Sequence, residues 1–216
     1  MFRIALLLSC LLVTGTGAAQ PVQHRGNHVQ AEAWSIGPVI NGRNYSRRMP
    51  AQPSPYPGGG WYLDLPRAPG SVHYLTFRHG SLAGKKRIVL RYRVEAAPGV
   101  RIVPRTAPNL PSILTAYIQR GGDDWSGVGS YETYRWYATF ASHSPISAGE
   151  HQMAVPLNGN WTAVQSSSAR TNPAAFRAAL AAADRIGFVL GGGDGFGHGV
   201  FATGPARLVV TSFRVE

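Results

Sequence analysis

The strand pattern that decides the fold is clearest in residues 87–95, which read Arg-Ile-Val-Leu-Arg-Tyr-Arg-Val-Glu. Positions 88, 90, 92 and 94 are apolar or aromatic, whereas positions 87, 91, 93 and 95 carry charge. Successive side chains of a β-strand point to opposite faces of the sheet. The alternation therefore predicts a strand with one face against a core and the other face outside.

Runs of the same kind recur between turn signals from Trp61 onward. Besides 87–96, they cover 62–65, 72–78, 113–120, 133–140, 151–157, 185–190 and 207–215. Short strands at this spacing are typical of an all-β antiparallel sandwich or barrel. The abundance of Gly (26) and Pro (16) and the low share of charged residues (14%) agree with a turn-rich β protein.

A single short helix is predicted at about residues 173–184, before the penultimate long strand. Asn172 is a good capping residue, and Pro173 occupies the favoured first helical position. Phe176 and Leu180 then fall on one face of the helix. The apolar run that begins at Ile186 follows directly and is interpreted as a strand.

The chain of 216 residues, 44% of them apolar, is long enough to bury a core. No composition break divides it after residue 61, so we expect one domain at 61–216. Residues 20–60 are rich in Pro and Gly and are predicted to form an irregular segment that lies over this domain. Its apolar residues that can hold it in place are Trp34, Ile36, Val39 and Ile40.

Residues 1–19 have the pattern of a secretory signal peptide. Arg3 supplies a positive start, residues 4–13 are almost entirely apolar, and Gly17 and Ala19 stand where a signal peptidase reads. We expect cleavage near Ala19 and an exported protein, periplasmic or extracellular, that does not span a membrane. The only cysteine, Cys10, lies in this segment, so the mature chain is predicted to contain no disulfide; lipidation of Cys10 is the alternative.

The period-two pattern also predicts a ligand-binding face. In residues 113–120, Leu114, Ala116 and Ile118 would face the core, which leaves Tyr117 and Gln119 outside. In residues 133–140 the same pattern leaves Arg135 and Tyr137 outside, and Arg91 and Arg93 are expected nearby. Aromatic rings cover the apolar C–H faces of sugars, while amide and guanidinium groups bond their hydroxyls.

The Gly-rich loop at 121–130 carries Asp123, Asp124 and Trp125 between those two strands. Binding residues concentrate on such loops, so all three are candidates for the rim of the same site. The alternative is that Trp125 tucks under its own loop and the two carboxylates support turns. The sequence leaves both readings open.

Several segments together resemble a group of uncharacterised exported bacterial proteins, over nearly the whole mature chain. The segments are 36–42, 60–66, 72–74, 91–95, 119–125, 186–188 and 197–200. The order of strands, with a short helix before the penultimate one, is similar to galactose-binding-like and carbohydrate-binding-module jelly rolls. This resemblance implies an antiparallel jelly-roll β-sandwich and a carbohydrate ligand, but no catalytic residue.

Enzyme chemistry has few candidates in this chain. The best carboxylate pair for glycoside hydrolysis is Asp123 or Asp124 with Glu132. Residues 91–95 faintly resemble a strand of polysaccharide lyases, without the companion motifs. The loop at 191–199 offers Asp194 and His198 as further polar contacts or as turn-stabilising residues. The sequence contains no Gly-x-Ser-x-Gly, His-Glu-x-x-His or Asp-x-Asp-x-Asp-Gly motif.

The net charge of +11 comes almost entirely from Arg, since Lys85 and Lys86 are the only lysines. An acidic glycan is therefore an open alternative to a neutral one. Nucleic acid is disfavoured as a partner by export and by the lack of clustered basic residues beyond 85–87. We expect a non-catalytic glycan-binding module without a cofactor; a structural calcium ion stays open, and so does an envelope-associated scaffold that interacts through the Pro-rich segment.

Overall fold

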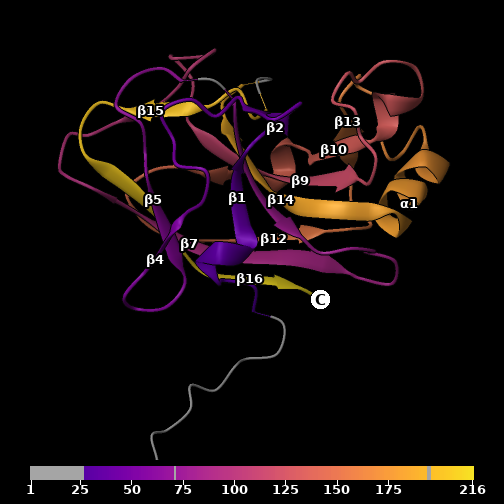
Figure 1. Ribbon diagram of the computed structural model, residues 1–216, viewed down its shortest axis with the longest axis horizontal. Coiled ribbons are helices and arrows are strands. Elements are labelled where there is room, and N and C mark those ends of the chain that lie inside the picture. The colour runs from indigo at the N-terminus through magenta and orange to yellow at the C-terminus, as the bar shows by residue number, and fades with distance from the viewer. Residues whose placement is uncertain (1–26, 71, 194–195) are drawn as a thin grey trace, which may run out of the picture.

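A computed structural model describes residues 27–216 except 71, 194 and 195. The predicted signal peptide, its cleavage site and Cys10 all lie outside the described residues. The described chain forms two antiparallel β-sheets packed face to face, with the sheet of β9 and β14 above the sheet of β7, β12 and β16 in Figure 1.

The first sheet runs in the order β1-β6-β14-β9-β10-β13, and β11 also pairs with β9. Its strands are β1 (Trp34–Gly37), β6 (His73–Arg78), β9 (Ile113–Arg120), β10 (Arg135–Ala138), β11 (Ser144–Pro145), β13 (Trp161–Ala163) and β14 (Ala183–Gly191). The second sheet runs β12-β7-β16-β5-β4. Its strands are β4 (Ser54–Pro55), β5 (Trp61–Asp64), β7 (Arg87–Ala96), β12 (Gly149–Pro156) and β16 (Ala206–Val215).

The strand order is that of a jelly roll. The central part of the first sheet is β6-β14-β9-β10, and that of the second is β5-β16-β7-β12. Followed along the chain, these strands make two interlocked Greek keys, which is the jelly-roll topology. The predicted all-β antiparallel jelly-roll sandwich is therefore confirmed.

Smaller elements complete the fold at the ends of the sandwich. Two short strand pairs are β2 (Val39–Ile40) with β3 (Arg43–Asn44) and β8 (Ile102–Pro104) with β15 (Val200–Ala202). Single 3₁₀ turns are η1 (Ala31–Ala33), η2 (Gly129–Thr133) and η3 (Phe140–Ser142). The turn η2 follows β9 and leads the chain back into β10, so it fixes the loop that carries Trp125.

The core between the sheets follows the alternation read from the sequence. Ile88, Leu90, Tyr92 and Val94 of β7 are at most 3% exposed and face the interior. Trp136 of β10 is fully buried on the opposite sheet. Burial of such side chains removes apolar surface from water and is the main stabilising contribution to the sandwich.

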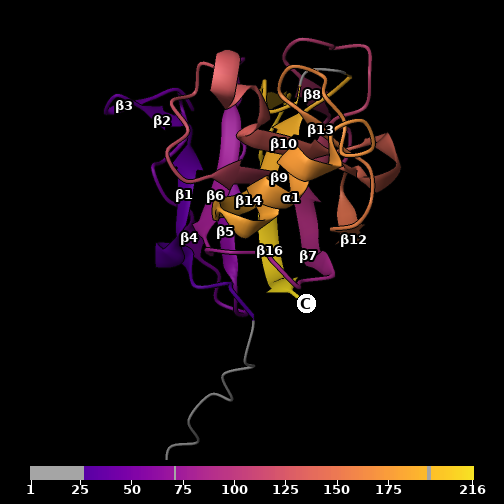
Figure 2. The ribbon, with the colours of Figure 1, turned by 90° about the vertical axis from the view of Figure 1, so that its right-hand side faces the viewer.

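The helix α1 (Pro173–Ala181) lies where the sequence predicts it and ends three residues earlier than expected. The Asn172 side chain accepts a hydrogen bond from the Ala175 N–H at 3.3 Å, which caps the helix start. Phe176 packs against Trp136 and Trp161, with ring centroids 4.9 and 5.8 Å away. The helix contacts both β9 and β10 and lies at the end of the molecule that is on the right in Figure 1 and faces the viewer in Figure 2.

The segment expected to be irregular contributes strands to both sheets. β1 pairs with β6 at the edge of the first sheet, and β4 pairs with β5 at the edge of the second. Trp34 and Ile36 are each 1% exposed and anchor β1 in the core, whereas Val39 is 54% exposed. Strands of two to four residues are too short to show a period that could be recognised among the Pro and Gly residues.

Candidate functional site

The predicted sheet face exists, but it is covered and not open to solvent. Tyr117, Gln119, Arg135 and Tyr137 do share the outer face of the first sheet, opposite the core residues of β9 and β10. Their exposed fractions are only 0, 4, 4 and 5%. The expectation of an exposed aromatic and Arg-lined surface is therefore wrong, because the loop after β9 folds back over this face.

Under that loop lies a second, small core, which we call the tyrosine cluster and define as Tyr74, Tyr117, Tyr137 and Val189. The hydroxyls of Tyr74 and Tyr137 are 2.7 Å apart and share a hydrogen bond. Burial raises the pKa of Tyr137, and it raises the pKa values of Tyr74 and Tyr117 well above the usual range. These phenols are therefore neutral structural groups at physiological pH.

A chain of polar groups runs from the tyrosine cluster to the loop. The Tyr117 hydroxyl donates to Gln119 Oε1 at 2.6 Å, and Gln119 Nε2 donates to Asp123 Oδ2 at 2.8 Å. Arg135 Nη1 lies 3.2 Å from the same Asp123 oxygen. The side chains of Asp123 and Arg135 are only 1 and 5% exposed, so this ion pair is buried.

The buried ion pair also fixes Trp125. The Trp125 N–H donates to Asp123 Oδ1 at 3.1 Å, and its carbonyl accepts from Arg135 Nη2 at 3.1 Å. The Arg135 guanidinium lies 4.8 Å from the centre of the indole ring, and Tyr74 meets the ring edge-on at 5.3 Å. Trp125 has a left-handed backbone with φ +68°, a conformation that a bulky residue adopts only where its surroundings hold it.

Beside Trp125 the outer face is hollowed into a cleft of about 450 Å³, which we call the Trp125 cleft. Its residues come from the β1 edge, from β6, and from the chain around the end of β9 and the start of β14. They are Ser35, Gly37, Pro38, Val39, Thr76, Gln119, Arg120, Gly122, Asp123, Trp125, Asp184 and Arg185. The small side chains of Ser35 and Thr76, paired across β1 and β6, leave the room that aromatic residues fill elsewhere on this face.

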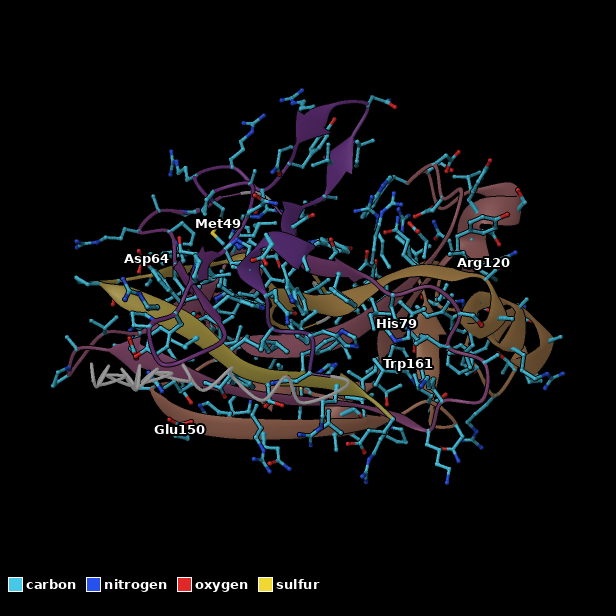
Figure 3. The ribbon with its side chains drawn as sticks, turned by 60° about the horizontal axis from the view of Figure 1, so that its bottom comes forward. Met49, Asp64, His79, Arg120, Glu150 and Trp161 are labelled. Atoms are coloured by element: carbon cyan, nitrogen blue, oxygen red, sulfur yellow. The ribbon has the colours of Figure 1, made fainter. Side chains whose placement is uncertain are left out.

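Among the charged groups at the Trp125 cleft, Arg120 alone has no acidic partner among the described residues. Asp184 and Arg185 form an ion pair at 3.4 Å, and Asp123 is neutralised by Arg135 behind the wall. Arg120 lies over the ring of Tyr134 at 4.3 Å, at the end of the molecule that carries η2 and α1 (Figure 3). The cleft thus offers both signs of charge next to the apolar surfaces of Trp125 and Val39.

The predicted site residues separate into four groups in the structure. Gln119, Asp123 and Trp125 line the Trp125 cleft together. Tyr117 and Arg135 lie behind its wall, and Tyr137 instead lines a second hollow of about 470 Å³ with Tyr74, Phe196 and His198. Asp124 is exposed and accepts hydrogen bonds from the Ser126 hydroxyl and N–H, which lower the pKa of its carboxyl group.

Sequence reasoning missed the far wall and floor of the cleft. Ser35, Thr76 and Arg185 belong to three strands whose side-by-side order becomes visible only through their pairing. The alternation in residues 72–78 and 185–190 would have placed Thr76 and Arg185 on the outer face. Alternation alone could not predict that Thr76 and Arg185 lie near Gln119, because the sequence of one strand does not determine its register with a distant strand.

The residues considered for catalysis are engaged structurally. Both carboxylate oxygens of Asp123 accept hydrogen bonds inside the wall, and Glu132 is exposed on η2. Tyr92, in the strand that resembles lyases, is fully buried and donates to Ser144 Oγ at 2.7 Å. Arg91 and Arg93 lie on β7 in the other sheet, so the expectation that they approach the predicted face is wrong.

The last two candidates, Asp194 and His198, come from the loop at 191–199. Asp194 lies outside the described residues, whereas His198 lines the second hollow and its carbonyl accepts from Arg105 Nε at 2.8 Å. Within the described residues, no group of three or more His, Cys, Asp or Glu side chains could hold a metal ion. No helix in that part of the chain is long and apolar enough to cross a membrane.

The fold and the cleft define the class, an antiparallel jelly-roll β-sandwich with a polar and aromatic hollow on the outer face of one sheet. No protein-family model matches the chain, and no curated protein matches it.

Proposed function

We propose that the protein is an exported, non-catalytic glycan-binding module and that the Trp125 cleft is its binding site. The observation that carries the proposal is the way Trp125 is held. Two hydrogen bonds, to Asp123 and from Arg135, clamp its backbone in a left-handed conformation and set the ring at the cleft. A rigid aromatic wall lowers the ordering cost of binding, which favours a ligand-binding role for this residue.

The groups around the ring suit a saccharide. Trp125 and Val39 supply apolar surface for the C–H face of a sugar ring, while Arg120 and Arg185 supply planar donors for its hydroxyls. A volume of about 450 Å³ is in the usual range of small-ligand sites. Export, which rests on the predicted signal peptide, would bring the protein to compartments where glycans are abundant.

The charge of the cleft suits a neutral glycan and adds a modest attraction for an acidic one. Arg185 and Arg135 are paired with Asp184 and Asp123, so Arg120 is the one cation at the cleft without an acidic partner among the described residues. If the ligand removes about 100 Å² of apolar surface from water, the gain is on the order of 2–3 kcal/mol before ordering costs are subtracted. This gain alone corresponds to a Kd on the order of 10 mM for one sugar unit, and we expect tighter binding when several units are engaged.

A glycan array followed by affinity electrophoresis in neutral and acidic polysaccharides tests the proposal. Wild type is compared with Trp125→Ala and Arg185→Gln, and Tyr62→Ala is the matched control. Tyr62 is a partly exposed aromatic residue on β5 in the opposite sheet, stacked with Arg207, and it does not line the cleft. We expect the two cleft variants to lose retardation by at least about fivefold and the control to keep it.

The outcomes that contradict the proposal are distinct. Equal retardation of wild type and both cleft variants would place the glycan elsewhere on the molecule. Absence of any glycan binding by wild type would favour the scaffold alternative. Release of new reducing ends or unsaturated sugars from a retained polysaccharide would show that the site is catalytic, and the non-catalytic part of the proposal would be wrong.

A further inference from the structure

A second cavity of about 420 Å³ lies against α1 and shares no lining residue with the Trp125 cleft. We call it the Phe176 cavity. Its floor is apolar: Leu157, at the end of β12, and Phe176, on α1, are 2 and 5% exposed. Leu180, one turn further along α1, is half-buried and packs against the same core. The floor continues the interior of the sandwich to the surface.

The rim of the Phe176 cavity carries four cationic side chains. Lys85 and Lys86 come from the loop before β7, Arg170 from the loop before α1, and Arg177 from α1 itself. All four residues are exposed, and no acidic residue lines the cavity. The rim is thus strongly cationic directly above an apolar floor.

These four cations have no ion-pair partner among the described residues, although most acidic residues there are paired with Arg. Glu216, near Lys86 in the fold, pairs with Arg87 and Arg214. Asp64 and Glu150 lie at the opposite end of the molecule from α1 (Figure 3). The concentration of unpaired positive charge at one cavity calls for an anionic partner.

We propose that the Phe176 cavity binds an amphiphilic carboxylate, with its carboxylate between Arg170 and Arg177. Its aliphatic or aromatic body would lie on Leu180 and Pro173, above the buried floor. Guanidinium groups are the preferred partners of carboxylates, and an apolar floor with few polar groups is typical of small-ligand sites. The chain's own N-terminal residues do not fit this charge, because residues 1–26 contain no Asp or Glu. The ligand is therefore a separate molecule.

Isothermal titration calorimetry with octanoate tests the proposal on the mature protein, in low salt at pH 7. A ligand of this size in a partly open cavity should bind with a Kd on the order of 0.1–1 mM. Shortening the chain to butyrate should weaken binding by about two- to fourfold per methylene removed. Octanol, the neutral match, should bind at least about tenfold more weakly than octanoate.

The charge contribution is tested with the double variant Arg170→Gln/Arg177→Gln. Because neither guanidinium has an ion pair among the described residues, folding should be preserved, which the near-ultraviolet circular dichroism spectrum checks. We expect at least about a tenfold loss of octanoate affinity. The matched control is Arg67→Gln/Arg101→Gln, which removes two exposed, unpaired arginines outside the cavity and should bind octanoate like wild type.

Four results would overturn the proposal. The first is that octanoate does not bind at 10 times the expected Kd. The second and third are that butyrate or octanol binds with the same affinity as octanoate, and the fourth is that both double variants lose the same factor in octanoate affinity. The last result would indicate a general effect of net charge and not a site. In affinity electrophoresis, the Arg170→Gln/Arg177→Gln variant should be retarded by the glycan as strongly as wild type. Failure of the carboxylate proposal can therefore be told apart from failure of the glycan proposal.

Discussion

At the scale of single residues, Asp123 and Arg135 form a buried ion pair that also holds the backbone of Trp125. Both side chains are almost completely buried, and each also bonds the backbone of Trp125. A buried ion pair costs desolvation energy on both partners, so removing one partner leaves an uncompensated charge behind. The two residues therefore stabilise the position of Trp125 and make the loop sensitive to substitution.

A double-mutant cycle tests this pair. Asp123→Ala alone should reduce the free energy of unfolding by about 3–5 kcal/mol, because it strands the buried Arg135 charge. The double variant Asp123→Ala/Arg135→Met should recover at least half of that loss. Urea unfolding of wild type, Asp123→Ala, Arg135→Met and the double variant gives the coupling free energy. Additive effects of the two substitutions would show that the pair does not interact as described.

Gly187 is a second residue whose identity is dictated by its neighbours. It lies in β14 between Thr76 of β6 and Tyr117 of β9, with φ +154°, and a Cβ there would come within 1.9 Å of the Leu75 carbonyl oxygen. Gly187→Ala should cost more than about 3 kcal/mol of stability. In the control Gly121→Ala, the added Cβ meets only Asp184 Cβ at 3.7 Å, and the cost should stay below about 1 kcal/mol. Similar losses for both would contradict the close approach.

At the scale of elements, the site depends on what covers each face of the first sheet. On the inner faces of the two sheets, alternation in β7 of the second sheet and β9 of the first predicted the strand bounds and the inward-facing residues, because both strands are long and alternate in polarity. On its outer face, alternation placed Tyr117 and Tyr137 correctly but could not show their cover. The cover comes from Trp125 and Phe196, which lie in loops far from some of the strands that they touch.

The short strands could not be predicted from the sequence. β1 and β13 have four and three residues and hold no recognisable period, yet they complete the two edges of the first sheet. In consequence, the sequence indicated the Gln119, Asp123 and Trp125 wall of the cleft and missed the opposite wall on β1. The chemistry of a loop can be read locally, whereas the partner that faces it is set by register.

The inward position of Trp136 on β10 predicts a large loss of stability when its ring is removed. Trp136 is fully buried between the sheet and Phe176, so Trp136→Ala should cost about 3–5 kcal/mol. The cap residue gives a smaller reference: Asn172→Ala should cost about 1 kcal/mol, because it removes one capping bond from α1. Chemical denaturation measures both. A loss for Trp136→Ala below about 1 kcal/mol would mean that its ring is not in the core.

At the scale of the whole molecule, we expect the sandwich to lose stability in acid through a buried histidine. His73, on β6, is fully buried, and its Nδ1 accepts from the Val200 N–H at 3.3 Å, which links β6 to β15. Burial, together with the nearby Arg105, lowers the pKa of His73 to about 4. Protonation would remove the acceptor and place a charge in the interior.

The sign of the pH dependence follows from this lowered pKa. The unfolded chain binds the proton more tightly, so the stabilisation is complete above about pH 6.5 and is lost as the pH falls toward 4. We expect a loss of about 3 kcal/mol over that range. Urea unfolding at several pH values should show a shallower dependence for His73→Gln, while His151→Gln on the edge strand β12 keeps the wild-type profile. Identical profiles for His73→Gln and wild type would contradict this role.

The central claim is that a saccharide binds in the Trp125 cleft. A crystal structure of the protein with an oligosaccharide selected on the glycan array tests this claim most directly. We predict a sugar ring in the Trp125 cleft, between Trp125 and Val39, with hydroxyls in hydrogen-bond contact with Arg120 or Arg185. A saccharide bound at any other place, with the Trp125 cleft empty, would contradict the central claim.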